Sequence, residues 1–168
     1  MELRVATEHD LDSALDLLEV VAAERVYIGA EPPINRAATR SRWIRELLSS
    51  TSGTMLVAVD DARVVGALQM KGGGSVDIGM FVDPAMRGRG IGTALLDAAI
   101  AWARKTGVYK ITLKVWPHNV GAIRLYARFG FEREAYIRRQ YRRNSGEIWD
   151  CVIMSLVIAE DQEGPGGP

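Results

Sequence analysis

Three glycines at alternate positions form the part of this sequence best suited to chemistry: Gly88, Gly90 and Gly92. They follow a strand-like stretch at 75–82 and precede a stretch at 91–102 whose apolar residues recur at helical spacing. A glycine-rich turn at the start of a helix lets several backbone N–H groups point toward one anion, at the positive end of the helix dipole. Arg87 and Arg89 add positive charge beside this turn. The stretch therefore predicts a binding site for a phosphate or pyrophosphate group.

The spacing of the glycines separates this loop from the two commonest phosphate-binding motifs. A Walker A loop needs a lysine followed by serine or threonine after its last glycine, and this pair is missing here. The dinucleotide fingerprint needs Gly-x-Gly-x-x-Gly, but Thr93 occupies the position of its third glycine. What remains is Arg-x-x-Gly-x-Gly, at Arg87, Gly90 and Gly92. Taken alone, this pattern also fits a turn that merely joins a strand to a helix.

A second segment, residues 119–131, predicts a short helix with polar groups on one face. Asn119 is suited to cap its N-terminus, and Gly130 lies where a glycine commonly ends a helix. At ~100° per residue, the side chains of Asn119 and Tyr126 return to nearly the same face, roughly 10 Å apart along the axis. The same residues also fit a plain cap and a tyrosine of the core.

Together, the two segments resemble the acyl-CoA-binding core of the GNAT superfamily of N-acetyltransferases. The first resembles the pyrophosphate loop of that family. The second resembles its Asn-x-x-Ala-x-x-Leu-Tyr-x-x-x-Gly-Phe segment, with these further residues in register: Ala122, Leu125, Tyr126, Gly130 and Phe131. The resemblance implies that acetyl-CoA is the co-substrate and that these residues bind it: Phe81, Val82, Arg87, Gly88, Arg89, Gly90, Ile91, Gly92, Thr93, Asn119 and Tyr126.

The order of the predicted elements resembles the GNAT fold from about residue 3 to residue 158. This implies an α/β (α+β) architecture with a mixed, mostly antiparallel central sheet of about seven strands flanked by about four helices. We expect strands at 3–6, 55–60, 63–70, 75–82, 110–115, 131–141 and 148–158, and helices at 7–23, 37–48, 91–106 and 119–129. A single domain then covers residues 1–158, and the polar residues 159–168 are expected to be a disordered tail.

In the GNAT fold, the strand that here carries Val82 splays away from the strand at 110–115, and the gap admits the pantetheine arm of the cofactor. The resemblance implies that Phe81 and Val82 hold this arm and polarise the thioester carbonyl through their backbone groups. An exposed strand edge offers unpaired N–H and C=O groups, which suits this role.

The implied reaction is direct attack of a neutral amine on the thioester, with a general acid for the leaving thiolate and a base for the ammonium proton. The resemblance assigns the acid to Tyr126 and a contact with pantetheine or an ordered water to Asn119. A thiol pKa of ~8.5 against ~10 for a phenol makes this proton transfer mildly uphill. For the base, Asp77, Glu31, Asp150 and a chain of waters all remain open, and each carboxylate also fits an ordinary surface position.

Composition restricts the class of protein. In 168 residues, 21 Lys and Arg balance 21 Asp and Glu, which gives no support for binding to nucleic acid. Cys151 is the single cysteine, so an internal disulfide is excluded, and the two histidines are too few and too scattered to predict a metal site. The sequence has neither an apolar run of membrane-spanning length nor a signal-peptide profile. We therefore expect a cytoplasmic enzyme without a metal, and a homodimer is compatible with the sequence.

The resemblance implies transfer of acetyl from acetyl-CoA to a primary amine, and the residues favour a small acceptor such as an amino acid. The expected single domain has no accessory part for docking a large substrate. The loop carboxylate of Glu31 and an arginine cluster near the end of the chain would suit a zwitterion: Arg133, Arg138, Arg139, Arg142 and Arg143. The alternatives are acetylation of peptide N-termini or lysines, a non-catalytic acyl-CoA-binding module, and an arginine-rich interaction module.

Overall fold

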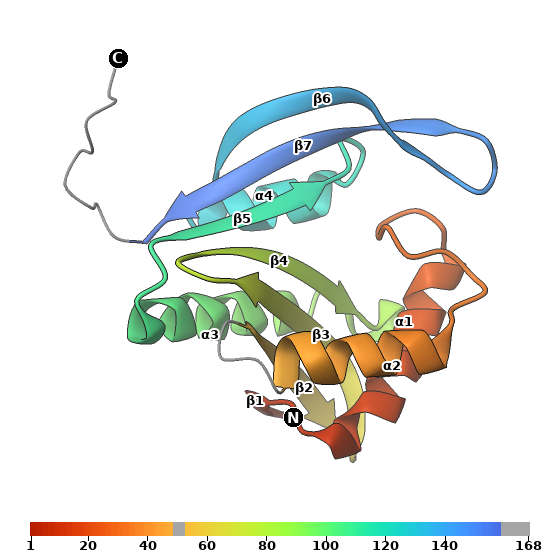
Figure 1. The fold of residues 1–168 in the computed structure, drawn as a ribbon, viewed down its shortest axis with the longest axis vertical. Helices are drawn as coiled ribbons and strands as arrows, with labels where there is room; N and C mark the ends of the chain where they lie inside the picture. The colour runs from red at the N-terminus through yellow and green to blue at the C-terminus, as the bar shows by residue number, and fades with distance from the viewer. Residues whose placement is uncertain (49–52, 159–168) are drawn as a thin grey trace.

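A computed structural model describes residues 1–48 and 53–158 and shows one seven-stranded sheet (Figure 1). The strands are β1 (Glu2–Val5), β2 (Gly53–Asp60), β3 (Arg63–Gly72), β4 (Ser75–Val82), β5 (Lys110–Val115), β6 (Glu132–Arg142) and β7 (Ile148–Val157). Their order across the sheet is β1-β2-β3-β4-β5-β7-β6. Only the β4–β5 pair is parallel among these strands. The mixed, mostly antiparallel sheet predicted from the sequence is thereby confirmed.

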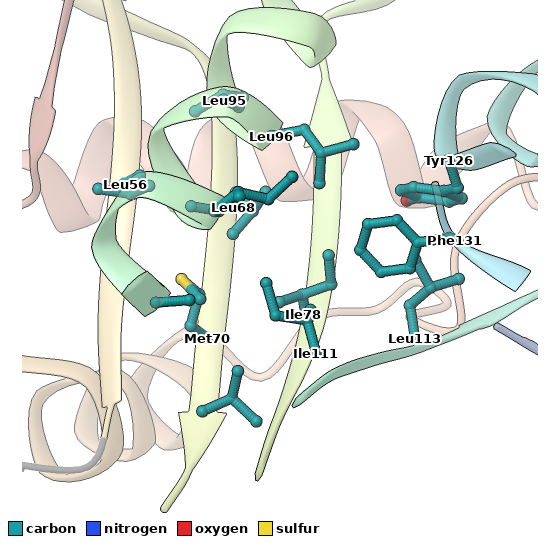
Figure 2. Close-up of a cluster of buried hydrophobic side chains, with 14 of the residues drawn as sticks. Leu56, Leu68, Met70, Ile78, Leu95, Leu96, Ile111, Leu113, Tyr126 and Phe131 are labelled. Atoms are coloured by element: carbon teal, nitrogen blue, oxygen red, sulfur yellow. The ribbon is translucent and has the colours of Figure 1, made fainter. Parts of the chain in front are cut away.

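Helices cover both faces of the sheet (Figure 1). The described residues contain α1 (Leu11–Ala23), α2 (Arg36–Trp43), α3 (Ile91–Thr106) and α4 (Val120–Arg128). The α1 and α2 helices pack on one buried cluster, which includes Leu15, Trp43 and Phe81. On the other face, α3 and α4 contribute Leu95, Leu96 and Tyr126 to a second cluster (Figure 2). Two apolar layers form because successive strand residues point to opposite faces.

The β4–β5 pair is short, and this shortness creates the site. Its register runs from Ser75 opposite Lys110 to Ile78 opposite Leu113, and no pairing follows between the later residues of β4 and β5. On its other edge, β4 remains paired with β3 as far as Val82. The part of β4 from Gly79 to Val82 therefore has hydrogen-bonding groups facing a gap, as the predicted splay requires.

Most expected elements lie within one or two residues of their predicted bounds. Two helices differ. The first, expected at 7–23, becomes α-helical only at Leu11, after a 3-10 turn over Glu8–Asp10. The second, expected at 37–48, ends at Trp43, and Ile44–Leu48 forms a wider π-helical turn. This turn packs tightly on β2, since a Cβ atom at Gly53 would lie only 2.2 Å from the carbonyl oxygen of Glu46. Helical periodicity carries no information about such a close contact. The predicted tail, 159–168, lies outside the described residues.

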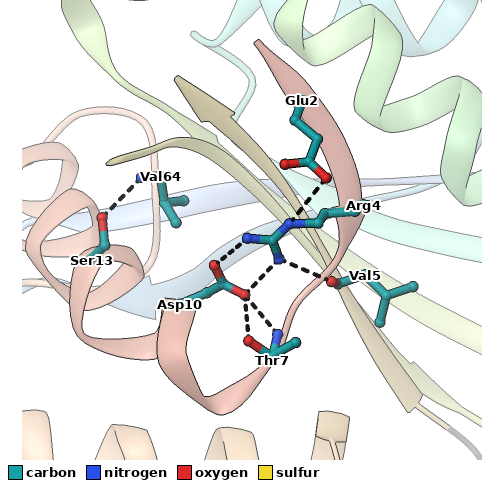
Figure 3. Close-up of polar contacts among 7 residues, drawn as sticks. All are labelled: Glu2, Arg4, Val5, Thr7, Asp10, Ser13 and Val64. Carbon is teal, nitrogen blue, oxygen red and sulfur yellow. Dashed lines mark hydrogen bonds and ion pairs between the residues drawn. The ribbon is translucent and has the colours of Figure 1, made fainter. Parts of the chain in front are cut away.

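An ion pair fixes β1 to the start of α1 (Figure 3). Arg4 donates to both carboxylate oxygens of Asp10 at 2.7 and 2.8 Å, and the backbone N–H of Thr7 donates to the same carboxylate at 2.7 Å. The Asp10 side chain is only 9% exposed. Its hydrogen bonds from Arg4 lower its pKa from 3.8 to about 2, against the opposing effect of burial.

We expect Asp10→Asn to lower the free energy of unfolding by about 2 kcal/mol at pH 7, because a charge-assisted bond is lost while an oxygen remains to accept from Thr7. The folded pKa lies below the unfolded one, so the ion pair stabilises the fold above about pH 4 and loses its effect as the pH falls toward 2. Urea unfolding of both proteins should therefore show a smaller difference at pH 3 than at pH 7. An equal difference at both pH values would contradict this account.

Candidate functional site

A cavity of about 970 Å³ lies where β4 and β5 diverge. Its walls come from the end of β4, the loop that enters α3, the end of β5, α4 and the segment 27–29. This volume is at the upper end of the range for sites that hold cofactors and small ligands. Ten of the residues predicted to bind acetyl-CoA line it: Phe81, Val82, Arg87, Gly88, Gly90, Ile91, Gly92, Thr93, Asn119 and Tyr126.

The glycine-rich loop has the backbone that an anion site needs. Gly88 and Gly90 have φ values of +75° and +83°, a left-handed conformation that favours glycine. Gly90 is the N-cap of α3, so the N–H groups of the next three residues have no partner within the helix. Gly92 has a different role, because a Cβ atom there would approach the side chains of Leu125 and Met80 at 3.3 and 3.4 Å. Glycine at this position lets α3 lie close to α4.

Arg87, at the start of the glycine-rich loop, contacts the segment of the chain that follows α1. Its guanidinium donates to Glu24 at 2.8 Å and lies 4.9 Å from the ring centre of Tyr27. Glu24 caps the end of α1. Arg87 therefore ties the glycine-rich loop to the segment after α1. Arg89, the other predicted cationic residue of the loop, does not line the cavity.

Tyr126 and Asn119 border the same cavity from α4, as their helical spacing predicts. The Tyr126 side chain is buried and packs against Phe131, with ring centres 5.7 Å apart (Figure 2). Burial raises the pKa of the Tyr126 phenol to about 12. Asn119 is the N-cap of α4, and its side-chain oxygen accepts from the N–H of Ala122 at 3.3 Å.

The predicted carboxylates lie outside the cavity wall. Asp77 belongs to the paired part of β4, opposite Thr112, and its side chain is exposed. Asp150 accepts from the hydroxyl of Tyr136 and from the backbone N–H of Arg139, and these bonds lower its pKa. Neither of them, nor Glu31, lines the cavity.

Glu31 is held by Arg143, a residue of the β6–β7 loop. The Arg143 side chain is 4% exposed and lies 3.6 Å from Glu31, while the N–H of Asn144 donates to the same carboxylate. Arg143 also donates to the carbonyl oxygens of Ile28 and Gly29 at 3.3 and 3.2 Å. Figure 1 shows the tip of the β6–β7 hairpin beside the loop between α1 and α2. The Glu31–Arg143 pair therefore joins two walls of the cavity, and both charges are already occupied.

Aromatic rings complete this clamp. The Arg143 guanidinium lies 4.4 Å from the ring centre of Trp149 and 5.6 Å from that of Trp116. Trp116 in turn makes an edge contact with Tyr141 at 5.1 Å between ring centres. Trp116 and Tyr141 both line the cavity. One end of the cavity is therefore aromatic and covered by the clamped loop.

Lys114 and His118 also line the wall, and the sequence prediction gave neither of them a role. The Nε2 atom of His118 lies 2.8 Å from the carbonyl oxygen of Val26. Because a carbonyl oxygen can only accept a hydrogen bond, Nε2 carries the proton, and Nδ1 is left to accept one. Its ring also contacts Trp149 at 4.8 Å. Strand alternation could have placed Lys114 opposite the buried Leu113 and Val115, but His118 lies in a turn after β5, where the sequence gives no such signal.

Residues 1–48 and 53–158 contain no group of three or more His, Cys, Asp or Glu residues able to hold a metal ion. No helix in this part of the chain is long and apolar enough to cross a membrane. Cys151, the single cysteine, is buried, and burial raises the pKa of its thiol.

Comparison with known proteins gives matches in sequence and in fold. A family model described as the acetyltransferase (GNAT) family matches residues 21–131. The ribosomal protein bS18-alanine N-acetyltransferase of Escherichia coli is 41% identical over 78 residues, which cover 46% of this chain and 52% of that protein. The match therefore spans about half of that relative's length. The L-amino acid N-acetyltransferase AaaT of E. coli is 31% identical over 125 residues, covering 68% of this chain and 75% of that protein.

Two solved structures share the fold across nearly the whole chain. A ribosomal-protein-alanine N-acetyltransferase from Brucella melitensis has a TM-score of 0.85 and 24% identity, covering 94% of this chain and 99% of that chain. A GNAT superfamily phosphinothricin acetyltransferase from Sinorhizobium meliloti, solved in complex with AcCoA, has a TM-score of 0.85 and 21% identity, covering 98% and 94%.

Proposed function

Since the chain belongs to the GNAT family of acetyltransferases, we propose that it transfers acetyl from acetyl-CoA to the primary amine of a small molecule such as an amino acid. One observation carries this proposal. A single cavity is lined by the glycine-rich start of α3, the unpaired edge of β4 and the phenol side chain of Tyr126. These three features supply an anion site, a peptide-like edge and a proton-bearing group along one path.

The cofactor would lie along the splay. The free N–H groups at the start of α3, at Ile91, Gly92 and Thr93, suit the pyrophosphate. The edge of β4 toward β5 suits the amides of pantetheine, which would pair with it as an added strand does. A backbone N–H near Phe81 and Val82 would then stabilise the oxyanion that forms on the thioester carbonyl.

The proposed reaction is a direct transfer, in which the bond that forms is matched by the bond that breaks. The amine nitrogen forms a bond to the carbonyl carbon, the carbon–sulfur bond breaks, and the sulfur leaves as a thiolate. With the Tyr126 pKa at about 12 and a thiol pKa of ~8.5, complete proton transfer from the phenol is strongly uphill. We infer that Tyr126 donates a hydrogen bond to the developing thiolate, and that solvent completes the protonation.

The ammonium proton needs an acceptor at the aromatic end of the cavity. We assign this role to Nδ1 of His118, since His118 lines the cavity and its Nε2 is committed to Val26. The carboxylates of Asp77 and Glu31 would reach the amine only through ordered water. The sequence left Asp77, Glu31 and Asp150 open as bases, and none of them lines the cavity.

Three single variants separate these roles. We expect His118→Ala to lower kcat at least tenfold and added imidazole to restore part of it, because the base is then supplied from solution.

Glu31→Gln should raise KM for the amine a few-fold with kcat nearly unchanged, because it loosens the clamp at Arg143. Asp77→Asn should change neither constant appreciably. Steady-state kinetics with rescue decides the matter, and a large kcat loss in Asp77→Asn would instead identify that residue as the base.

The acceptor class is supported by the clamped wall and by the relatives. The loop carrying Ile28 and Gly29 is fastened across the aromatic end of the cavity, which favours a small molecule over a folded protein. One relative is named as an L-amino acid N-acetyltransferase. A peptide N-terminus is the second candidate, because another relative is named for the alanine of a ribosomal protein.

A screen of acceptor amines tests this proposal. Thiol release from acetyl-CoA would be measured with L-amino acids, polyamines, aminoglycosides, and peptides that carry a free N-terminus or an internal lysine. We expect the highest kcat/KM among the amino acids. Faster turnover of peptide N-termini than of every free amine would favour the second candidate. Thiol release with none of these amines, despite binding of acetyl-CoA, would leave only a binding module.

A further inference from the structure

The charges in the cavity wall are all of one sign. Its lining includes the cations of Arg87, Lys114 and Arg128 but neither aspartate nor glutamate. Arg87 is paired with Glu24 and belongs to the glycine-rich loop. Arg128 is the last residue of α4. Lys114 is therefore the cation that β5 places in this wall, and an anionic ligand would be its natural counterpart.

The position of Lys114 follows from strand register. On β5, Leu113 and Val115 point into the core beneath α3 and α4, so Lys114, between them, points to the opposite face. Lys114 directly follows Leu113, the last residue of β5 that pairs with β4. Gly79 is the residue at the corresponding position of β4. A Cβ atom at Gly79 would meet nothing within 4 Å, so the space beside Lys114 is open.

The positive charge of Lys114 acts on this face. It partly offsets the burial that raises the pKa of the Cys151 thiol, and Cys151 belongs to the neighbouring strand β7. Among the described residues, Lys114 has neither a hydrogen bond nor an ion pair, whereas Lys110 on the same strand pairs with Glu134 at 2.6 Å. Lys110 therefore has an anionic partner among the described residues, and Lys114 has none there.

The phosphates of the cofactor are too far along the strand to be that partner. From Gly79 to the loop after Val82, β4 advances by roughly 10 Å, at about 3.3 Å for each residue. An anion beside Lys114 must therefore come from the acceptor, whose amine has to meet the thioester in the same part of the splay. We propose that Lys114 binds the α-carboxylate of the acceptor, so that free α-amino acids are preferred over their amides and over peptide N-termini. This inference rests on the proposed function.

Paired substrates test the contact. L-amino acids and their carboxamides would be compared by kcat/KM in the wild type, in Lys114→Met, in Lys114→Arg and in the matched control Lys110→Met. We expect the wild type to prefer the acids by about tenfold to a hundredfold, as a charge-assisted contact would give. Lys114→Met should reduce this preference to less than about threefold, chiefly by slowing turnover of the acids, while Lys114→Arg and Lys110→Met keep it.

The outcomes separate this inference from the proposed function. An undiminished preference for acids in Lys114→Met would overturn the inference and leave the proposed function standing. The same holds if the wild type turns over the amides as well as the acids. If neither acids nor amides are acetylated although acetyl-CoA binds, the proposed function fails, and the inference fails with it.

Discussion

Replacing Tyr126 by phenylalanine is expected to lower kcat about 10- to 100-fold and to leave the dissociation constant of acetyl-CoA within about twofold. The hydroxyl would donate to a charge that exists only as the thiolate leaves, and one such bond in a buried site contributes about 1.5–3 kcal/mol. Phenylalanine keeps the ring that packs on Phe131, so the fold should be retained. Steady-state kinetics together with calorimetric binding of acetyl-CoA measures both quantities.

Tyr136→Phe is the matched control for this variant. The hydroxyl of Tyr136, an exposed residue of β6, donates to Asp150 on β7, and neither residue lines the cavity. Its removal should leave kcat unchanged. Because the pKa of Tyr126 is raised to about 12, its phenol stays protonated over the ordinary assay range, and this residue should produce no fall in activity up to about pH 10. Normal turnover by the Tyr126→Phe variant would show that the residue serves packing alone.

Gly90→Ala is expected to weaken binding of acetyl-CoA at least about tenfold. The Cβ atom would meet nothing in the protein, so it would project into open space at the start of α3, where we propose that the pyrophosphate binds. The left-handed φ of +83° adds strain of about 1–2 kcal/mol for alanine. Isothermal titration with acetyl-CoA and thermal unfolding without it separate these two effects.

The same helix provides the control. Gly107 ends α3 with a φ of +76°, and a Cβ atom there also meets nothing within 4 Å. Gly107→Ala therefore carries similar backbone strain at the far end of the helix, away from the cavity. We expect it to lower stability by a comparable amount with unchanged affinity for acetyl-CoA. Equal loss of affinity in the two variants would mean that Gly90 acts through stability alone.

Local sequence features were sufficient to predict the cofactor side of the site. The glycine spacing at 88, 90 and 92 and the seven-residue spacing from Asn119 to Tyr126 depend only on neighbouring residues and helical geometry. The splay required one more step, the resemblance to the GNAT fold, because strand pairing across β4 and β5 is not encoded locally. All three features meet at one cavity in the structure.

The acceptor side was harder to predict, because its contacts join distant parts of the chain. Glu31 was expected to hold an ammonium, but it contacts Asn144, 113 residues away, and the buried Arg143. The sequence shows five arginines in that region without indicating which of them is buried. Lys114 and His118 line the cavity because β5 diverges from β4 there, and this divergence depends on strand pairing between distant parts of the chain.

The most direct test of the central claim is the stoichiometry of one reaction. The wild-type protein would be incubated with acetyl-CoA and a mixture of L-amino acids, with released thiol measured by colorimetry and N-acetylated products by mass spectrometry. We predict one N-acetyl amino acid for each thiol released, and about 10- to 100-fold less of both products with Tyr126→Phe over the same time. Thiol release without an acetylated amine, or acetyl-CoA binding without any thiol release, would contradict the account.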